Sequence, residues 1–160
     1  MERKIRILDI GLNIAILHIA NKLTGGFLVS DTAPTTFGQL IAQCNRDKLV
    51  TVWSGASETT IYGDPEVNYA FRAWHDWCHW QSNHDFSESG EEAVLKMQCA
   101  HITALFGDTP GTRHWHKILE AEIIGQKQHH KTFGYFPTDQ FAFVEAYISN
   151  GTNSAPKAAM

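Results

Sequence analysis

Residues 65 to 81 carry apolar side chains around most of a helical circumference, and this stretch constrains the fold more than any other. The positions concerned are Tyr69, Phe71, Ala73, Trp74, Trp77, Cys78 and Trp80. Pro65 after Asp64 is typical of the first turn of a helix. A helix that is apolar on most sides has to be covered by other elements, so this segment predicts a buried central helix.

The remaining sequence predicts a mainly α fold. Further helices are expected over residues 5–23, 34–44, 89–106, 112–130 and 138–149. Residues 49–53 and 59–62 have strand character and flank Ser54-Gly55, which is consistent with a small β-hairpin near 49–62. We therefore expect a single-domain bundle of about six helices over residues 1–149, followed by a flexible C-terminal tail over 150–160.

The first predicted helix has an apolar face formed by Ile7, Ile10, Ile14 and Leu17, and Gly25-Gly26 follows it. We interpret it as an amphipathic helix that packs into the core, with the glycines ending it. Basic residues precede its apolar stretch, as in a signal peptide. However, polar residues interrupt the stretch and no cleavage pattern follows, so we expect neither a leader nor a membrane span.

Composition narrows the function classes. The net charge is -4, and no basic run exceeds two residues, so a nucleic-acid surface is not expected. Three cysteines without a CxxC spacing argue against a disulfide framework or a zinc ribbon and favour a reducing cytoplasm. The nine histidines are more suggestive, because imidazole is the commonest metal ligand in proteins.

A polar stripe on the central helix carries the first candidate site. It contains Arg72, His75, Asp76 and His79, since successive residues advance about 100° around a helix. His75 and His79 are four residues apart, a spacing that lets two imidazoles reach one ion. The alternative is an ordinary solvated stripe, but such a stripe usually carries Lys, Glu and Gln.

Two pairs of glutamates differ in their helical phase. Glu91 continues an apolar stripe, whereas Glu92 forms a capping-box pattern with Ser89 and faces outward. Glu122 shares a face with Ile118, Leu119, Gln126 and His129, whereas Glu120 lies among charged residues. A buried carboxylate must be paired, protonated or metal-bound. Glu91 and Glu122 are therefore candidate ligands. The alternatives are a helix N-terminal acid for Glu91 and a structural pair with Arg72 for Glu122.

Further imidazoles lie near these faces. His101 is at the edge of the Glu91 face, and His129 is seven residues after Glu122. Together the pattern predicts one divalent metal ion (Zn, Fe or Mn) with ligands among His75, His79, Glu91, Glu122, His101 and His129. Arg72, Asp76 and Glu91 are the expected catalytic residues.

Part of this pattern resembles a group of uncharacterised proteins of bacteriophages and bacteria. Residues 71–126 resemble their arrangement of F-R-x-x-H-D-x-x-x-H, then F-x-x-x-G-E, then E-x-x-G-Q, although this chain has one residue fewer between Asp76 and His79. Members often have Gly before the second His, where this chain has Cys78. The His75-Asp76 pair also resembles the ligands of the all-helical HD-type phosphohydrolases. That resemblance implies an earlier His, for which His18 is the candidate, and a later Asp. Asp108 and Asp139 are the later candidates, but neither lies on a clear helix face, so Glu91 and Glu122 would have to replace the expected ligands.

Three functions are compatible with these residues. The first is a metal-dependent hydrolase of phosphoesters or amides, in which Arg72 binds an anionic group of a small-molecule substrate. The second is a non-haem iron oxygenase or oxidase, because two imidazoles and carboxylates suit Fe(II). The third is a non-catalytic accessory domain whose polar cluster is a buried hydrogen-bonded network.

Overall fold

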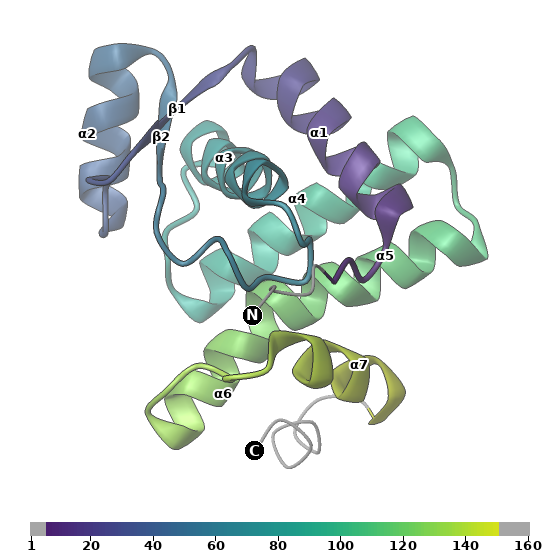
Figure 1. The fold of residues 1–160 in the computed structure, drawn as a ribbon. Coiled ribbons are helices and arrows are strands. Elements are labelled where there is room, and N and C mark those ends of the chain that lie inside the picture. Colours follow the sequence, from purple (N-terminus) through teal and green to yellow (C-terminus); the bar gives the residue numbers. More distant parts are fainter. Residues whose placement is uncertain (1–5, 151–160) are drawn as a thin grey trace, which may run out of the picture. The chain divides into compact units, whose positions relative to one another are not determined.

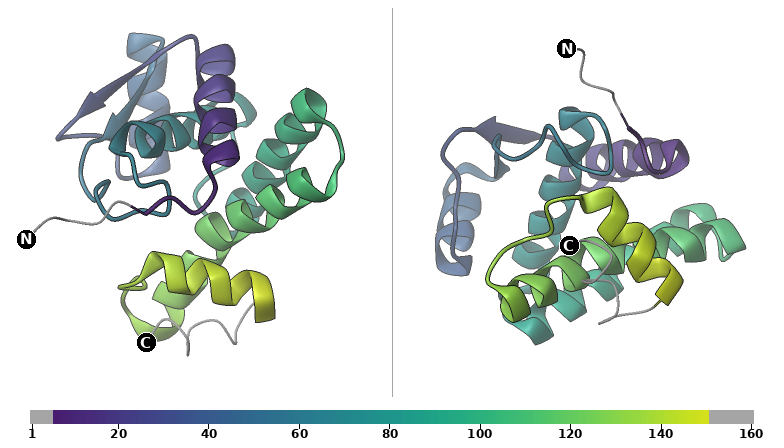
Figure 2. Two further views of the ribbon diagram at one scale, coloured as in Figure 1. Left: turned by 45° about the vertical axis from the view of Figure 1, so that its right-hand side comes forward. Right: turned by 60° about the horizontal axis from the view of Figure 1, so that its bottom comes forward.

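The computed structural model describes residues 6–150 and divides the chain into two compact units, Met1–Gly90 and Glu91–Met160 (Figure 1, Figure 2). Each unit is described by itself. The mainly α prediction is confirmed, whereas the predicted tail over 150–160 lies almost wholly outside the described residues. No helix within the described part of the chain has both the length and the apolarity needed to cross a membrane.

In the first unit, α3 is the central element. The elements of this unit are α1 (Ile10–Thr24), β1 (Phe27–Ser30), α2 (Phe37–Asp47), β2 (Val50–Trp53), α3 (Pro65–Ser82) and the first turn of α4 (Glu88–Phe106). Helix α3 packs against α1, α2 and β2, which lie around it in Figure 1. Ala73, Trp74 and Cys78 are fully buried, so the prediction of a covered helix is confirmed.

Helix α1 buries the face opposite to the predicted one. Ile10 and Ile14 are 61% and 62% exposed, and Ile7 and Leu17 are also exposed, whereas Ile16 is fully buried. The prediction was wrong because this helix is apolar on most sides, and periodicity alone could not choose the inner face. The buried Asn13 side chain donates a hydrogen bond to the Tyr62 carbonyl (2.8 Å), which helps to select the observed orientation.

The strands form a two-stranded parallel sheet, not a hairpin. Phe27 pairs with Val50 and Ser30 with Trp53, and α2 makes the connection between the strands. The prediction of a strand over 59–62 was wrong, since that segment is bends and turns. Helix α2 begins at Phe37 after the Thr36 cap, three residues later than predicted.

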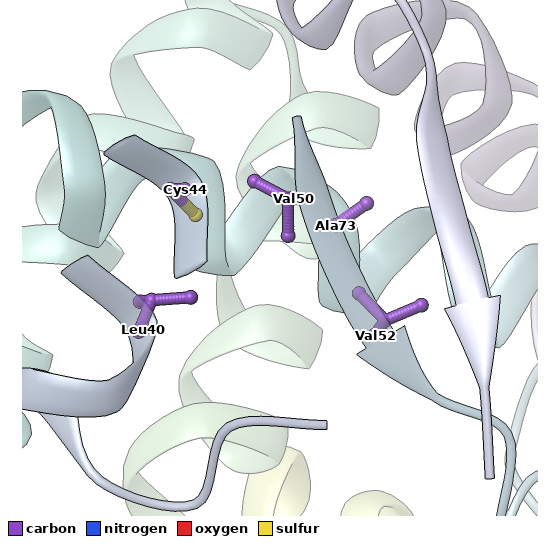
Figure 3. Close-up of a cluster of buried hydrophobic side chains, with 5 residues drawn as sticks. All are labelled: Leu40, Cys44, Val50, Val52 and Ala73. Atoms are coloured by element: carbon purple, nitrogen blue, oxygen red, sulfur yellow. The ribbon is translucent and has the colours of Figure 1, made fainter. Parts of the chain in front are cut away.

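The core of the first unit fixes β2 between α2 and α3. The cluster at this position consists of the buried residues Leu40, Cys44, Val50, Val52 and Ala73 (Figure 3). Partly buried aromatic residues pack against this cluster, among them Trp80, whose indole Nε1 donates to Asn45 Oδ1 at 2.9 Å. These contacts hold α3, and with it the polar stripe, in one orientation relative to α2.

The start of α4 differs from the prediction. The helix begins at Glu88, and the Ser87 hydroxyl accepts a hydrogen bond from the Gly90 amide (3.2 Å). The Asp85 carboxylate accepts from the Ser87 amide at 3.1 Å. Ser87 is therefore the cap, and the predicted capping box of Ser89 and Glu92 was wrong. Only Ser89 has a glutamate three residues later, but the Asp85 turn places Ser87 at the start of the helix.

The second unit contains a helical run interrupted by a π-helical turn. It comprises the rest of α4, then α5 (Pro110–Glu120), η1 (Ala121–Gly125), α6 (Gln126–Phe133) and α7 (Gln140–Asn150). The sequence predicted one helix over residues 112–130, without the π turn. Gly125 packs against α7, where a Cβ atom would lie 2.7 Å from the Tyr147 ring.

Candidate metal site

The two histidines of α3 face one another. Asp64 caps this helix and Pro65 occupies its first turn, as the sequence predicts. The ring centroids of His75 and His79 are 4.7 Å apart, and their Nε2 atoms are separated by 3.2 Å. Two nitrogens bound to one tetrahedral Zn²⁺ at about 2.0–2.1 Å would lie roughly 3.3 Å apart. The imidazole pair is therefore already spaced as two ligands of one ion.

A hydrogen bond defines which nitrogen of His79 is available. His79 Nδ1 lies 2.7 Å from the backbone carbonyl of His84. Because a carbonyl only accepts, Nδ1 carries the proton in the neutral ring and Nε2 keeps its lone pair. A backbone carbonyl at the far nitrogen is a common partner of metal-binding histidines, because it fixes both the tautomer and the ring orientation.

Glu91 supplies the third donor. His75, His79 and Glu91 each offer a ligand atom, and these atoms all lie within 4.8 Å of one another. Glu91 directly follows Gly90, whose amide is bonded to Ser87, so the local turn at the start of α4 places it. Glu91 is 8% exposed and Glu92 is exposed, which confirms the predicted difference between these neighbours.

Aromatic side chains enclose the imidazoles. Phe86 packs edge-on against His79 at 4.8 Å, and Phe37 does so at 6.5 Å. Phe71 stacks on His75 with a centroid distance of 6.1 Å. His79 has no exposed surface. The surroundings are therefore apolar, which strengthens charge interactions at the nitrogens.

Arg72 is tied to the loop after β2. Its Nη1 donates to the carbonyls of Trp53 (2.6 Å) and Gly55 (2.7 Å), and the guanidinium lies 5.5 Å from the Trp53 ring centroid. Burial lowers the pKa of Arg72, and the nearby Asp76 charge opposes that effect. These contacts give Arg72 a structural task. The expected roles of Arg72 in anion binding and of Asp76 in catalysis stay predictions.

Glu122 in the second unit has an unusual environment. Gln126 Nε2 donates to Glu122 Oε2, and Oε1 is buried without a hydrogen-bond partner among the described residues. Burial raises the pKa of Glu122 to about 8. Glu120 is exposed, so the predicted contrast between these two glutamates is confirmed.

The other predicted ligands also belong to the second unit. His129 is 2% exposed, and its Nδ1 lies 2.9 Å from the Tyr135 carbonyl. His101 is half-buried, and burial lowers its pKa. Participation of Glu122, His101 and His129 in a metal site stays a prediction.

Several features of the site were not predicted from the sequence. They are the aromatic contacts of Phe37 and Phe86, the His84 carbonyl and the π turn at Glu122. Gly125 within a helical pattern was a usable signal, because glycine inside a helix often marks close packing or an irregular turn. The His84 carbonyl had no such signal, since any residue supplies a carbonyl.

Comparison with known proteins adds no family. No protein-family model, curated protein or solved structure matches the chain. The arrangement of donor atoms and their surroundings is thus the basis for a functional proposal.

Proposed function

We propose that the chain is a metal-dependent hydrolase whose divalent ion is bound by His75, His79 and Glu91. The observation that carries the proposal is the convergence of two imidazoles and one carboxylate within 4.8 Å, with His79 and Glu91 buried. Catalytic zinc sites commonly have three protein ligands and one open position, whereas structural sites have four. A Zn²⁺ or Mn²⁺ ion in such a site lowers the pKa of a coordinated water to near neutrality.

The residues around the ligands have separate tasks in this proposal. In the neutral ring, the His84 carbonyl leaves the lone pair of His79 on Nε2, and Phe37 and Phe86 pack around that ring. Arg72, one turn before His75, is the residue that we expect to meet an anionic group of the substrate. An incoming phosphate would have to share the guanidinium with the Trp53 and Gly55 carbonyls.

The same donor set supports a second candidate, a non-haem iron oxygenase. Two histidines and one carboxylate are the facial triad that binds Fe(II) and leaves positions for dioxygen. The Nε2 separation of 3.2 Å suits either metal, because octahedral ligands at about 2.1–2.2 Å lie roughly 3.0–3.1 Å apart.

Metal binding is tested first, on untagged protein, by elemental analysis and calorimetric titration with Zn²⁺. Metal that binds only the native state at a hundredfold excess over Kd stabilises it by about 2.7 kcal/mol. For a chain of this length, that free energy corresponds to a rise in Tm of roughly 5–11 °C. His79→Ala and Glu91→Gln are expected to lose most of this rise.

Two neighbours provide matched controls. His84→Ala removes an exposed imidazole but keeps the backbone carbonyl that His79 needs, and Glu92→Gln changes the exposed carboxylate next to Glu91. Both are expected to retain the metal response. A protein that binds no divalent metal, or controls that lose the response equally, would overturn the proposal and favour a buried hydrogen-bonded network.

Activity then separates the two candidates. Hydrolysis of phosphoesters, nucleotides or amides with Zn²⁺ or Mn²⁺, lost in Glu91→Gln, supports the hydrolase. Oxygen consumption after anaerobic loading with Fe(II), without hydrolysis, supports the oxygenase instead.

A further inference from the structure

A groove lies between α4 and the run from α5 into η1, within the second unit. A short turn joins the two helices, and the Thr103 hydroxyl of α4 lies 3.3 Å from His116 Nε2 of α5. The groove has a volume of about 330 Å³, at the lower end of the range for small-molecule sites. Its apolar wall consists of Leu95, Cys99 and Ile124, which are all partly exposed. A small ligand can therefore cover apolar surface here.

Charges of both signs line the same groove. Glu92 and Lys96 come from α4, and Lys117 and Glu120 come from α5. All four side chains are exposed, and within the described part of the chain none of them forms an ion pair with another. Their spacings, four residues on α4 and three on α5, would permit such pairs along each helix. The groove therefore offers two carboxylates and two ammonium groups that do not neutralise one another.

The carboxylate of Glu120 is held in place from the side of α7. The hydroxyl of Tyr147, a buried residue, donates a hydrogen bond to it. Burial, together with the Glu120 charge, raises the pKa of Tyr147 to about 12, so this donor stays protonated at neutral pH. Burial and the Glu120 charge also raise the pKa of Cys99 to about 11. The Cys99 thiol is therefore neutral and adds apolar surface near a positioned carboxylate.

We infer that this groove binds a small zwitterion with an apolar body, of the class of the apolar α-amino acids. The ammonium of the ligand lies at Glu120, its carboxylate lies at Lys96 or Lys117, and its side chain covers the apolar wall. A purely anionic ligand would be repelled by the two glutamates, and a purely cationic ligand by the two lysines. The groove consists of residues of the second unit alone, so this inference does not depend on the proposed metal site.

Titration of ¹⁵N-labelled, metal-free protein with L-leucine, followed by backbone amide shifts, tests this binding. Metal is removed because an amino acid can itself ligate an ion at the proposed metal site. Leucine is expected to cause saturable shifts at the groove residues of α4 and α5. Two analogues each lack one charge, since 4-methylpentanoate has no ammonium and leucinamide has no carboxylate. Both should bind roughly three- to tenfold more weakly, the effect of losing one charge-assisted bond at an exposed site.

Substitutions decide whether the named charges bind the ligand. Glu120→Gln should abolish the preference for leucine over 4-methylpentanoate, because these probes differ in the ammonium. The double substitution of Lys96→Gln and Lys117→Gln should abolish the preference for leucine over leucinamide. A general loss of structure would weaken all probes together and leave both preferences in place. Glu145→Gln and Lys127→Gln are the matched controls and should keep both preferences, since these residues are exposed in the second unit and do not line the groove.

Three results would overturn the inference. The first is the absence of saturable shifts with leucine at tens of millimolar, or saturation only at residues away from the groove. The second is equal affinity of the wild-type protein for leucine and its two analogues. The third is retention of both preferences in the Glu120 and lysine variants. Because no metal is present, each of these results leaves the proposed metal site standing, and failure of metal binding leaves the groove standing.

Discussion

Replacement of Glu122 by glutamine should change how stability depends on pH. The folded protein holds this carboxyl at a pKa of about 8, against an ordinary value of 4.5, because burial disfavours its charged form. Between pH 4.5 and pH 8, the Glu122 carboxyl of the native state therefore holds a proton that the same group has released in the unfolded chain. The stabilisation from the protonated acid is therefore complete below pH 4.5 and is lost as pH rises through 8.

The size of the effect follows from the same two values. One pKa unit corresponds to 1.36 kcal/mol, so the loss reaches about 5 kcal/mol above pH 8 and about 3 kcal/mol at pH 7. Glutamine cannot ionise and resembles the protonated acid in shape, so Glu122→Gln should remove this loss. In a chain of this length, 5 kcal/mol corresponds to a difference in Tm of roughly 10–20 °C.

The assay is urea unfolding of metal-free protein in EDTA, from pH 5 to pH 9. Metal has to be absent because a bound cation would favour the ionised carboxylate. Glu120→Gln is the matched control, since Glu120 is exposed and lies two residues away on the same helical run. That control should keep the wild-type pH dependence. Parallel curves for wild type and Glu122→Gln would refute the reasoning, because they would show that the carboxyl is not buried in a protonated form.

Two further contrasts test the packing. Ile16→Ala should lower the unfolding free energy by about 2–5 kcal/mol because Ile16 is fully buried. Ile14→Ala should change it by about 0.5 kcal/mol or less, since that side chain is 62% exposed. Equal losses of unfolding free energy in urea would contradict the observed buried face of α1. Gly125→Ala should destabilise the fold because the added Cβ atom would lie 2.7 Å from the Tyr147 ring. Gly38→Ala should instead raise the unfolding free energy by about 0.5–1 kcal/mol, because Gly38 is in a helix and an added Cβ atom there has no neighbour within 4 Å. Thermal melts of this pair check the second contrast, and a stable Gly125→Ala would contradict the close approach of η1 to α7.

The fold could be predicted where local sequence and burial agree. Helix α3 has a proline at its start, an aspartate cap and apolar residues on most sides, and each signal indicates the same buried helix. The sheet could not be predicted in this way, because β1 and β2 are joined through α2 and the pairing of Phe27 with Val50 is not local. A hairpin between neighbouring segments is the simpler expectation from sequence, and it was wrong.

Helical phase was informative only where the two sides of a helix differ chemically. It distinguished Glu91 from Glu92 and Glu122 from Glu120, because burying a carboxylate is far more costly than burying a methylene group. It failed on α1, where one isoleucine stripe had to be chosen over another of similar hydrophobicity.

The candidate metal site shows where prediction from side-chain identity reaches its limit. The sequence predicts the three donors of the site, because His75 and His79 are four residues apart on one helix and Glu91 faces inward on the next. Whether an imidazole can bind an ion depends also on which nitrogen holds the proton, and the His84 carbonyl determines that for His79. This carbonyl is placed by the left-handed backbone of Asn83, a conformation that asparagine tolerates but does not require. The chemistry of the site therefore depends on a backbone turn as much as on its ligands, and a sequence motif records only the ligands.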